Sequence, residues 1–153
     1  MTMPAIGSIA PDFSLPDATS TPVKLSDFRG KTVLIFFYPK ALTPGCTVQA
    51  CDISANLEKL KRHNVIALGI SPDKPTLLQK FTQTHQLHET LLSDIGATVA
   101  QQYGVWQEKS MYGKTYMGIA RTSFLINPQG LVTHIFEKVS PKTHLADVLS
   151  ALS

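Results

Sequence analysis

Residues 31–51 read KTVLIFFYPKALTPGCTVQAC, and the change of pattern inside this stretch indicates how the chain folds. The stretch opens with a continuous apolar run rich in β-branched and aromatic side chains, which is typical of a buried central strand. Pro39 stops this strand, Thr43 suits a helix N-cap, and Pro44 suits the first helical position. We therefore expect a buried strand and then a helix that continues to about Arg62, with apolar residues at helical spacing: Val48, Ala50, Ile53, Leu57 and Leu60.

The chain on either side of this stretch alternates between strand-like and helix-like patterns. Residues 12–30 alternate around turn residues and predict a short hairpin. Further strands are expected at 64–71 and 90–94 and as a strand–turn–strand at 121–137, helices at 74–86, 95–104 and 141–153, and a loop or irregular hairpin at 105–118. This order predicts an α/β fold of the thioredoxin-like type, with a mixed central sheet flanked by helices and an N-terminal hairpin addition. We expect a single domain over residues 1–153.

Composition narrows the possible functions. The chain has 153 residues, 43% hydrophobic and 16% charged, which is enough apolar material for a folded core. The net charge is +3, and the 14 Lys and Arg residues are scattered along the chain. Their one cluster, KLKRH at 59–63, is typical of a solvated helix end. We therefore expect no nucleic-acid partner. No apolar run is long enough to cross a bilayer, and the N-terminus does not resemble a signal peptide. We therefore expect no membrane association and a cytoplasmic, reducing location.

The two cysteines, Cys46 and Cys51, are the residues that point to chemistry. In a reducing compartment, a close cysteine pair is more often catalytic or metal-binding than structural. Cys46 lies in the first turn of the expected helix, where free backbone N–H groups and the positive end of the helix dipole converge. Both features favour the thiolate, which is the nucleophilic form. Cys46 is therefore placed to be reactive.

The spacing of the pair keeps it apart in an intact helix. Residues five positions apart in an ideal helix have Cα atoms roughly 8–9 Å from each other. A disulfide needs less than about 7 Å. Cys46 and Cys51 therefore bond only if the start of the helix unwinds, and the cost of unwinding makes such a disulfide easier to reduce.

The residues around Cys46 resemble a known family. Pro39, Thr43 and Cys46 match the PxxxTxxC motif of peroxiredoxins, and PKALTPGCTVQAC resembles the peroxiredoxin Q, or bacterioferritin comigratory protein, subfamily. The likeness extends to PDFSLPD, LSDFRGKTVLIFFYPK, LGISPDK, LLSD, YGVW and GKTYMGIARTSFLI. It therefore covers nearly the whole chain.

The resemblance implies a thioredoxin-dependent, atypical 2-Cys peroxidase that reduces hydrogen peroxide and organic hydroperoxides. Cys46 would be the peroxidatic cysteine, whose thiolate becomes a sulfenic acid, and Cys51 the resolving cysteine that forms an intramolecular disulfide with it. Thioredoxin or a similar dithiol would then reduce the disulfide. The resemblance also implies a monomer that needs no cofactor, neither metal nor flavin nor haem.

The resemblance also assigns roles around the cysteines. Thr43 would orient peroxide and thiolate, Pro39 would shield the pocket, and Arg121 would stabilise the thiolate and the charge on the leaving oxygen. Gly45 would belong with these residues to the substrate-binding group. Many members carry Glu three residues after the peroxidatic cysteine; here Gln49 keeps a supporting hydrogen-bonding role without the charge.

Two other functional classes fit parts of the pattern. A thiol–disulfide oxidoreductase would share the fold, but that chemistry usually uses a CxxC pair. A metal-binding or redox-sensing module would also use a close cysteine pair. His85 and His88 have the spacing of one helix face, but the nearby ligand candidates are few, which favours a solvated helix end.

Overall fold

The computed structural model describes residues 2–152 and is built around a five-stranded sheet with the strand order β5-β4-β3-β8-β9. The strands are β3 (Thr32–Phe37), β4 (Val65–Ser71), β5 (Thr90–Ser93), β8 (Thr122–Ile126) and β9 (Val132–Phe136). The pairs β3–β4 and β4–β5 are parallel, whereas β3–β8 and β8–β9 are antiparallel. The sheet is therefore mixed, as the element order predicted.

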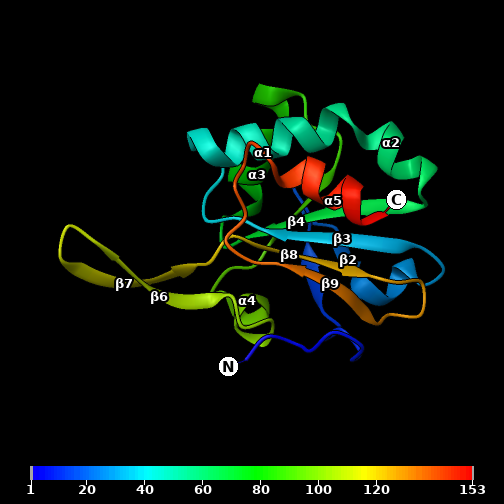
Figure 1. Ribbon diagram of the computed structural model, residues 1–153. Helices are drawn as coiled ribbons and strands as arrows, with labels where there is room; N and C mark the ends of the chain where they lie inside the picture. The colour runs from blue at the N-terminus through cyan, green and yellow to red at the C-terminus, as the bar shows by residue number, and fades with distance from the viewer. Residues whose placement is uncertain (1, 153) are drawn as a thin grey trace.

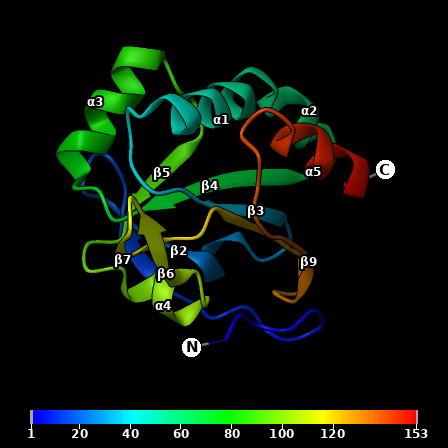
Figure 2. The same ribbon diagram turned by 60° about the vertical axis from the view of Figure 1, so that its left-hand side comes forward.

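Helices cover the two faces of the sheet unequally (Figures 1 and 2). One face carries α1 (Pro44–Ala55), α2 (Leu57–Arg62), α3 (Pro75–His85) and α5 (His144–Leu152). The other carries α4 (Thr98–Gln102), the 3-10 helix η1 (Leu25–Phe28) and the N-terminal segment. The last residue of the expected helix 141–153 lies outside the described residues.

The central strand β3 explains why its sequence is continuously apolar. Its alternate residues Leu34 and Phe36 pack into the core under α1 and α3, while Ile35 and Phe37 pack into a second core against α4 and the N-terminal segment. Because side chains alternate between the two faces of a strand, burial on both faces removes the polar positions. The prediction of a buried central strand is confirmed.

Two antiparallel hairpins lie outside the central sheet. The expected N-terminal hairpin is present as β1 (Ser14–Pro16) and β2 (Pro22–Lys24). The segment expected as a loop or irregular hairpin is a regular one, β6 (Trp106–Met111) paired residue by residue with β7 (Lys114–Ile119). The expectation of irregularity was wrong because most of this hairpin is exposed, so no apolar alternation marks it.

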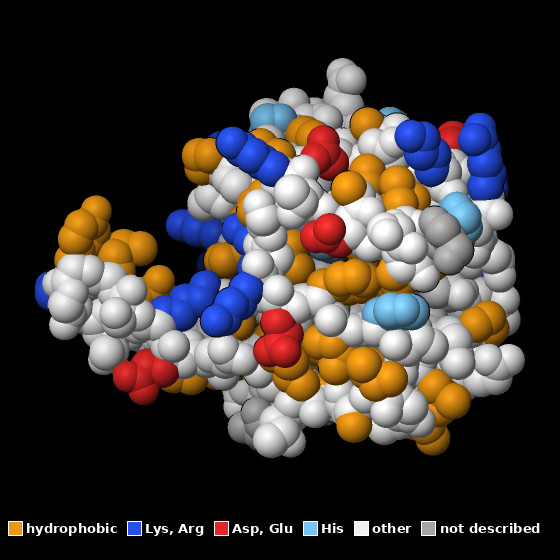
Figure 3. Space-filling view, viewed as in Figure 1, with side chains coloured by type: hydrophobic (Ala, Val, Ile, Leu, Met, Phe, Trp, Pro, Cys, Tyr) orange, Lys and Arg blue, Asp and Glu red, His pale blue; other side chains and the backbone are white. Residues whose placement is uncertain are grey.

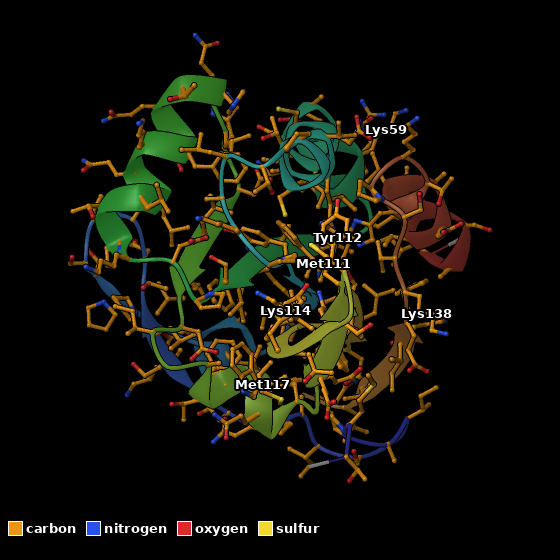
Figure 4. The ribbon with its side chains drawn as sticks, turned by 90° about the vertical axis from the view of Figure 1, so that its left-hand side faces the viewer. Lys59, Met111, Tyr112, Lys114, Met117 and Lys138 are labelled. Carbon is orange, nitrogen blue, oxygen red and sulfur yellow. The ribbon has the colours of Figure 1, made fainter. Side chains whose placement is uncertain are left out.

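The turn of the β6–β7 hairpin has a recognisable geometry. Tyr112 and Gly113 both have positive φ angles, 54° and 77°, as two-residue type I′ turns require. The hairpin projects from the body of the molecule, with Met111, Tyr112 and Lys114 at its outer end (Figures 1 and 4). Figure 3 shows hydrophobic side chains at that outer end and Lys and Arg side chains where the hairpin meets the body.

The expected helix from Thr43 to about Arg62 is interrupted. Asn56 separates α1 from α2: its side-chain amide donates to the Asp52 carbonyl at 2.9 Å, and its backbone N–H turns to the Ile53 carbonyl. An asparagine side chain that competes for the i−4 carbonyl in this way ends a helix. Val48, expected on the apolar face, is 40% exposed instead.

The end of α3 separates the two histidines that were expected to share a helix face. The helix ends at His85, and Gln86 follows in the left-handed conformation, so His88 lies outside the helix. Among the described residues, no group of three or more His, Cys, Asp or Glu side chains is placed to hold a metal ion. Within residues 2–152, no helix has the length and apolar character needed to span a membrane.

Candidate active site

The loop between β3 and α1 is fixed by the neighbouring strand. The carboxyl ends of parallel strands meet at one edge of a sheet, so the residues after β4 lie beside the residues after β3. Asp73 uses this proximity: its carboxylate accepts the N–H of Ala41 at 2.7 Å and the hydroxyl of Ser71 at 2.8 Å. Asp73 lies in the LGISPDK match, but no local pattern in the sequence marks it as a residue that supports the site.

Cys46 and Arg121 meet at the start of α1. Cys46 is buried, with 2% of its surface exposed, and Arg121 Nη2 donates to Cys46 Sγ at 3.3 Å. The sheet register explains the contact, since Phe37 at the end of β3 pairs with Thr122 at the start of β8. Arg121 immediately precedes β8 and therefore lies beside the helix that follows β3. Its fixed positive charge is therefore placed to stabilise negative charge that develops at the sulfur.

Gln49 holds the other side of the same guanidinium. It lies one turn after Cys46 on α1 and is buried, and its Oε1 accepts from Arg121 Nη1 at 2.6 Å. Arg121 thus donates from two nitrogens to two acceptors on one helix. Because the guanidinium is planar and rigid, these two bonds fix both its position and its orientation.

Cys51 lies on the same helix as Cys46, and the two cysteines are not bonded. This confirms that one helix holds both in the unbonded state. Partial burial, with the negative charges of Glu89 and Asp52, raises the pKa of the Cys51 thiol. In the folded helix, Cys51 is therefore held in its protonated, weakly nucleophilic form.

The comparisons with known proteins agree with this geometry. The AhpC/TSA family matches residues 6–135. The chain is a peroxiredoxin of the AhpC/TSA family. It is 51% identical over 146 residues to peroxiredoxin Bcp of Escherichia coli K12, covering 95% of this chain and 94% of that protein. It is 40% identical over 147 residues to peroxiredoxin Bcp of Bacillus subtilis, and this match covers 96% of this chain and 94% of that protein.

A solved structure shows the same fold in a relative. The Xanthomonas campestris bacterioferritin comigratory protein, described for its alkyl peroxide reduction activity, matches with a TM-score of 0.87 and 33% identity. The match covers 92% of this chain and 89% of that one. The thioredoxin-like fold and the Bcp/peroxiredoxin Q subfamily are thereby established for this peroxiredoxin, and with them its activity as a thiol peroxidase.

Thr43 occupies the N-cap position of α1 but does not cap it with its side chain. Its hydroxyl donates instead to the Lys40 carbonyl at 2.7 Å. A hydroxyl has a single proton, so Oγ1 is left with acceptor capacity only. The first turn of α1 therefore lacks the side-chain bond that usually secures a helix N-terminus.

A groove of about 450 Å³ lies beside the start of α1 in this peroxiredoxin. It is lined by Pro44, Gly45, Val48, Ser140, Pro141 and Lys142. Gly45 lies between the groove and Arg121. It lines the groove, and a Cβ added to it would lie 3.5 Å from Arg121 Nη2. A second hollow of about 440 Å³, lined by residues such as Asp12, Leu15 and Asp94, lies elsewhere; neither cysteine is among the lining residues of either hollow.

His144 and Ser123 also belong to the hydrogen-bonded group around Gln49, and neither was expected from the sequence. His144 Nδ1 lies 3.2 Å from Gln49 Nε2, and His144 Nε2 lies 2.7 Å from the hydroxyl of Ser123. A histidine in a closing helix has no spacing that ties it to a cysteine so far away in the chain. The available signal in the sequence was that a histidine stands at the start of an otherwise apolar helix face.

Proposed function

We propose that this peroxiredoxin reduces hydrogen peroxide and organic hydroperoxides with Cys46 as the peroxidatic cysteine and Cys51 as the resolving cysteine. The observation that carries the proposal is the 3.3 Å contact of Arg121 Nη2 with Cys46 Sγ at the start of α1. Negative charge on this sulfur is stabilised by two groups: the Arg121 guanidinium, which donates to it, and the positive end of the α1 dipole.

In the first step, the Cys46 thiolate attacks the O–H oxygen of the hydroperoxide and an S–O bond forms. The O–O bond breaks, the sulfur becomes a sulfenic acid, and the leaving oxygen takes a proton to become water or an alcohol. Arg121 stabilises the negative charge that develops on the oxygens. Since Thr43 Oγ1 keeps only acceptor capacity, it accepts a hydrogen bond from the peroxide O–H and so orients it. Pro39, two residues after β3, shields the reacting sulfur from solvent.

In the second step, the Cys51 thiolate attacks the Cys46 sulfenic sulfur, the S–S bond forms, and hydroxide leaves as water after taking a proton. The first turns of α1 must unwind for the sulfurs to meet. The missing side-chain cap at Thr43 lowers the cost of unwinding by about 1 kcal/mol. Unwinding also takes Cys51 out of the surroundings that raise its pKa, so its thiolate becomes available when it is needed.

The groove beside α1 bears on the substrate. Pro44, Gly45, Val48 and Pro141 give it an apolar lining, which suits the carbon chain of an alkyl hydroperoxide. The relative from Xanthomonas campestris is described for alkyl peroxide reduction, which agrees.

We further propose that residues 1–153 form a single domain that acts in the cytoplasm as a monomer, with no cofactor and with thioredoxin or a similar dithiol as reductant. Both cysteines come from one chain, so turnover does not require a second copy.

The experiment compares Cys46→Ser and Cys51→Ser with the parent in stopped-flow peroxide consumption, with and without a thioredoxin system. Cys46→Ser is expected to consume no peroxide. Cys51→Ser is expected to react once per site and then fail to turn over with thioredoxin. Parental consumption by Cys46→Ser would refute the proposal. Rapid insulin-disulfide reduction by the parent, with negligible peroxide consumption, would instead indicate a thiol–disulfide oxidoreductase.

A further inference from the structure

His144 is a buried histidine that connects helix α5 to the catalytic helix. It is the first residue of α5 and only 1% of its surface is exposed. Its two ring nitrogens are both occupied, Nδ1 by the Gln49 side-chain amide at 3.2 Å and Nε2 by the Ser123 hydroxyl at 2.7 Å. His144 therefore contacts Gln49, which in turn contacts Arg121, and this connection suggests that His144 acts on the site through Gln49.

The bond from Arg121 fixes which hydrogen-bonding groups face each other. Arginine can only donate, so the atom of Gln49 that it contacts at 2.6 Å must be the amide oxygen. The Gln49 NH₂ group therefore faces His144, and Nδ1 of the histidine must accept. The ring proton then lies on Nε2, which donates to Ser123 Oγ.

The surroundings of His144 keep this neutral form. The pKa of His144 is lowered to about 4, chiefly by burial; the nearby Asp147 charge opposes this shift and the Arg121 charge adds to it. A proton on Nδ1 would also point at the Gln49 NH₂ group, which is itself a donor. Nδ1 is therefore an acceptor throughout the neutral pH range.

We propose that His144 is a positioning residue for the reaction of Cys46. Its Nδ1 holds the Gln49 amide with the oxygen toward Arg121, and Gln49 in turn holds Arg121 Nη2 on Cys46 Sγ. The inference rests on the proposed role of Cys46 as the peroxidatic cysteine.

The physical need for such a residue follows from the shape of a glutamine amide. Its oxygen and NH₂ group are nearly the same size, so packing alone does not select between the two orientations. A flipped Gln49 would point two donors at each other on the Arg121 side and two acceptors at each other on the His144 side. With the ring proton on Nε2, the flip breaks two buried bonds at once, and His144 makes one of them. Restoring that bond would require the proton to move to Nδ1 and the Ser123 hydroxyl to turn from acceptor to donor. A carboxylate at this position would accept from arginine in either orientation, because both of its oxygens are acceptors. The Gln49 amide has only one acceptor oxygen, so a neighbouring group must hold it in the correct orientation.

The test uses the full-length protein with two matched variants, His144→Asn and His144→Gln. The Asn side chain is short enough to place an acceptor oxygen where Nδ1 lies, so it keeps the bond to Gln49. The longer Gln side chain places its amide near the position of Nε2, so it keeps only the bond to Ser123. The measurement is the rate constant for oxidation of Cys46 by peroxide in a single turnover, divided by the number of reactive sites in the burst. Unfolded molecules lower the burst and not the rate constant.

We expect His144→Gln to react about 10- to 100-fold more slowly than the parent, which is typical when a group that orients a reactive residue is lost. His144→Asn is expected to stay within about threefold of the parent, a loss well below 1.4 kcal/mol. Equal slowing of the two variants, or a parental rate constant in His144→Gln, would overturn the inference. A parent that shows no oxidation of Cys46 at all would refute the proposed function instead.

Discussion

Glu89 is a buried carboxyl group near Cys51, and its substitution gives a pH-dependent prediction. It lies just before β5 and is 6% exposed. Neither of its carboxylate oxygens has a hydrogen-bond partner of standard geometry among residues 2–152. Burial raises the pKa of Glu89 to about 7, while the nearby backbone N–H groups of His88 and Glu89 and the Ser54 hydroxyl oppose the shift.

The size of the effect follows from this pKa. A rise from 4.5 to about 7 corresponds to about 3 kcal/mol, at about 1.4 kcal/mol per pKa unit. The folded state binds the proton more tightly than the unfolded state. The stability that depends on protonated Glu89 is therefore fully present below about pH 4.5 and is lost as the pH rises through about 7.

Glu89→Gln removes the titrating group and keeps the shape. We expect the variant to match the parent at pH 4.5 and to exceed it by up to about 3 kcal/mol at pH 8.5. The assay is urea unfolding of the reduced protein, followed by Trp106 fluorescence across this pH range. Glu58→Gln is the matched control, because Glu58 is exposed on α2, and it should track the parent at every pH. A stability difference between Glu89→Gln and the parent that is the same at both ends of the range would refute the reasoning.

Three further substitutions test other parts of the account. Arg121→Lys replaces a planar donor to two acceptors with a single charged point, so kcat/KM for peroxide should fall about 10²- to 10³-fold in a steady-state assay; an unchanged value would contradict the role of Arg121. Cys51→Ser should accumulate sulfenic and then sulfinic acid at Cys46 under excess peroxide, seen by mass spectrometry, and the parent should show less; equal oxidation would count against Cys51 as the resolving residue. Gly69→Ala would place a Cβ 2.6 Å from the ring of Phe36, so the free energy of unfolding should fall by about 1–3 kcal/mol in urea titration, and an unchanged value would show that the core yields at this point.

The sequence predicted most clearly those elements that are buried on both faces or bounded by strong local signals. The strand β3 could be predicted because both of its faces lie in a core, which makes its sequence continuously apolar. The start of α1 could be predicted because Pro44 occupies its first position. The regular pairing of β6 with β7 could not be predicted, because most side chains of this hairpin are exposed and show no alternation of apolar and polar residues. Asn56 is an ordinary residue in a helical pattern until its side chain takes the Asp52 carbonyl.

The active site was predictable only in part. The helix dipole argument for Cys46 is local, so it could be made from the sequence. The contact with Arg121 joins residues 75 positions apart and depends on β8 lying beside β3, so only the family resemblance indicated it. Gln49 and His144 are 95 positions apart, and no pattern pairs them. The structure alone supplied His144.

In the proposed cycle, Cys46 and Cys51 form a disulfide after oxidation, although one intact helix keeps them apart beforehand. The most direct measurement is mass spectrometry of the reduced protein before and after one equivalent of peroxide, followed by peptide mapping without reduction. We predict a loss of two hydrogens and a cross-linked peptide that joins Cys46 to Cys51. Stable sulfenic acid at Cys46 with Cys51 still a free thiol, or a disulfide between two chains, would contradict it.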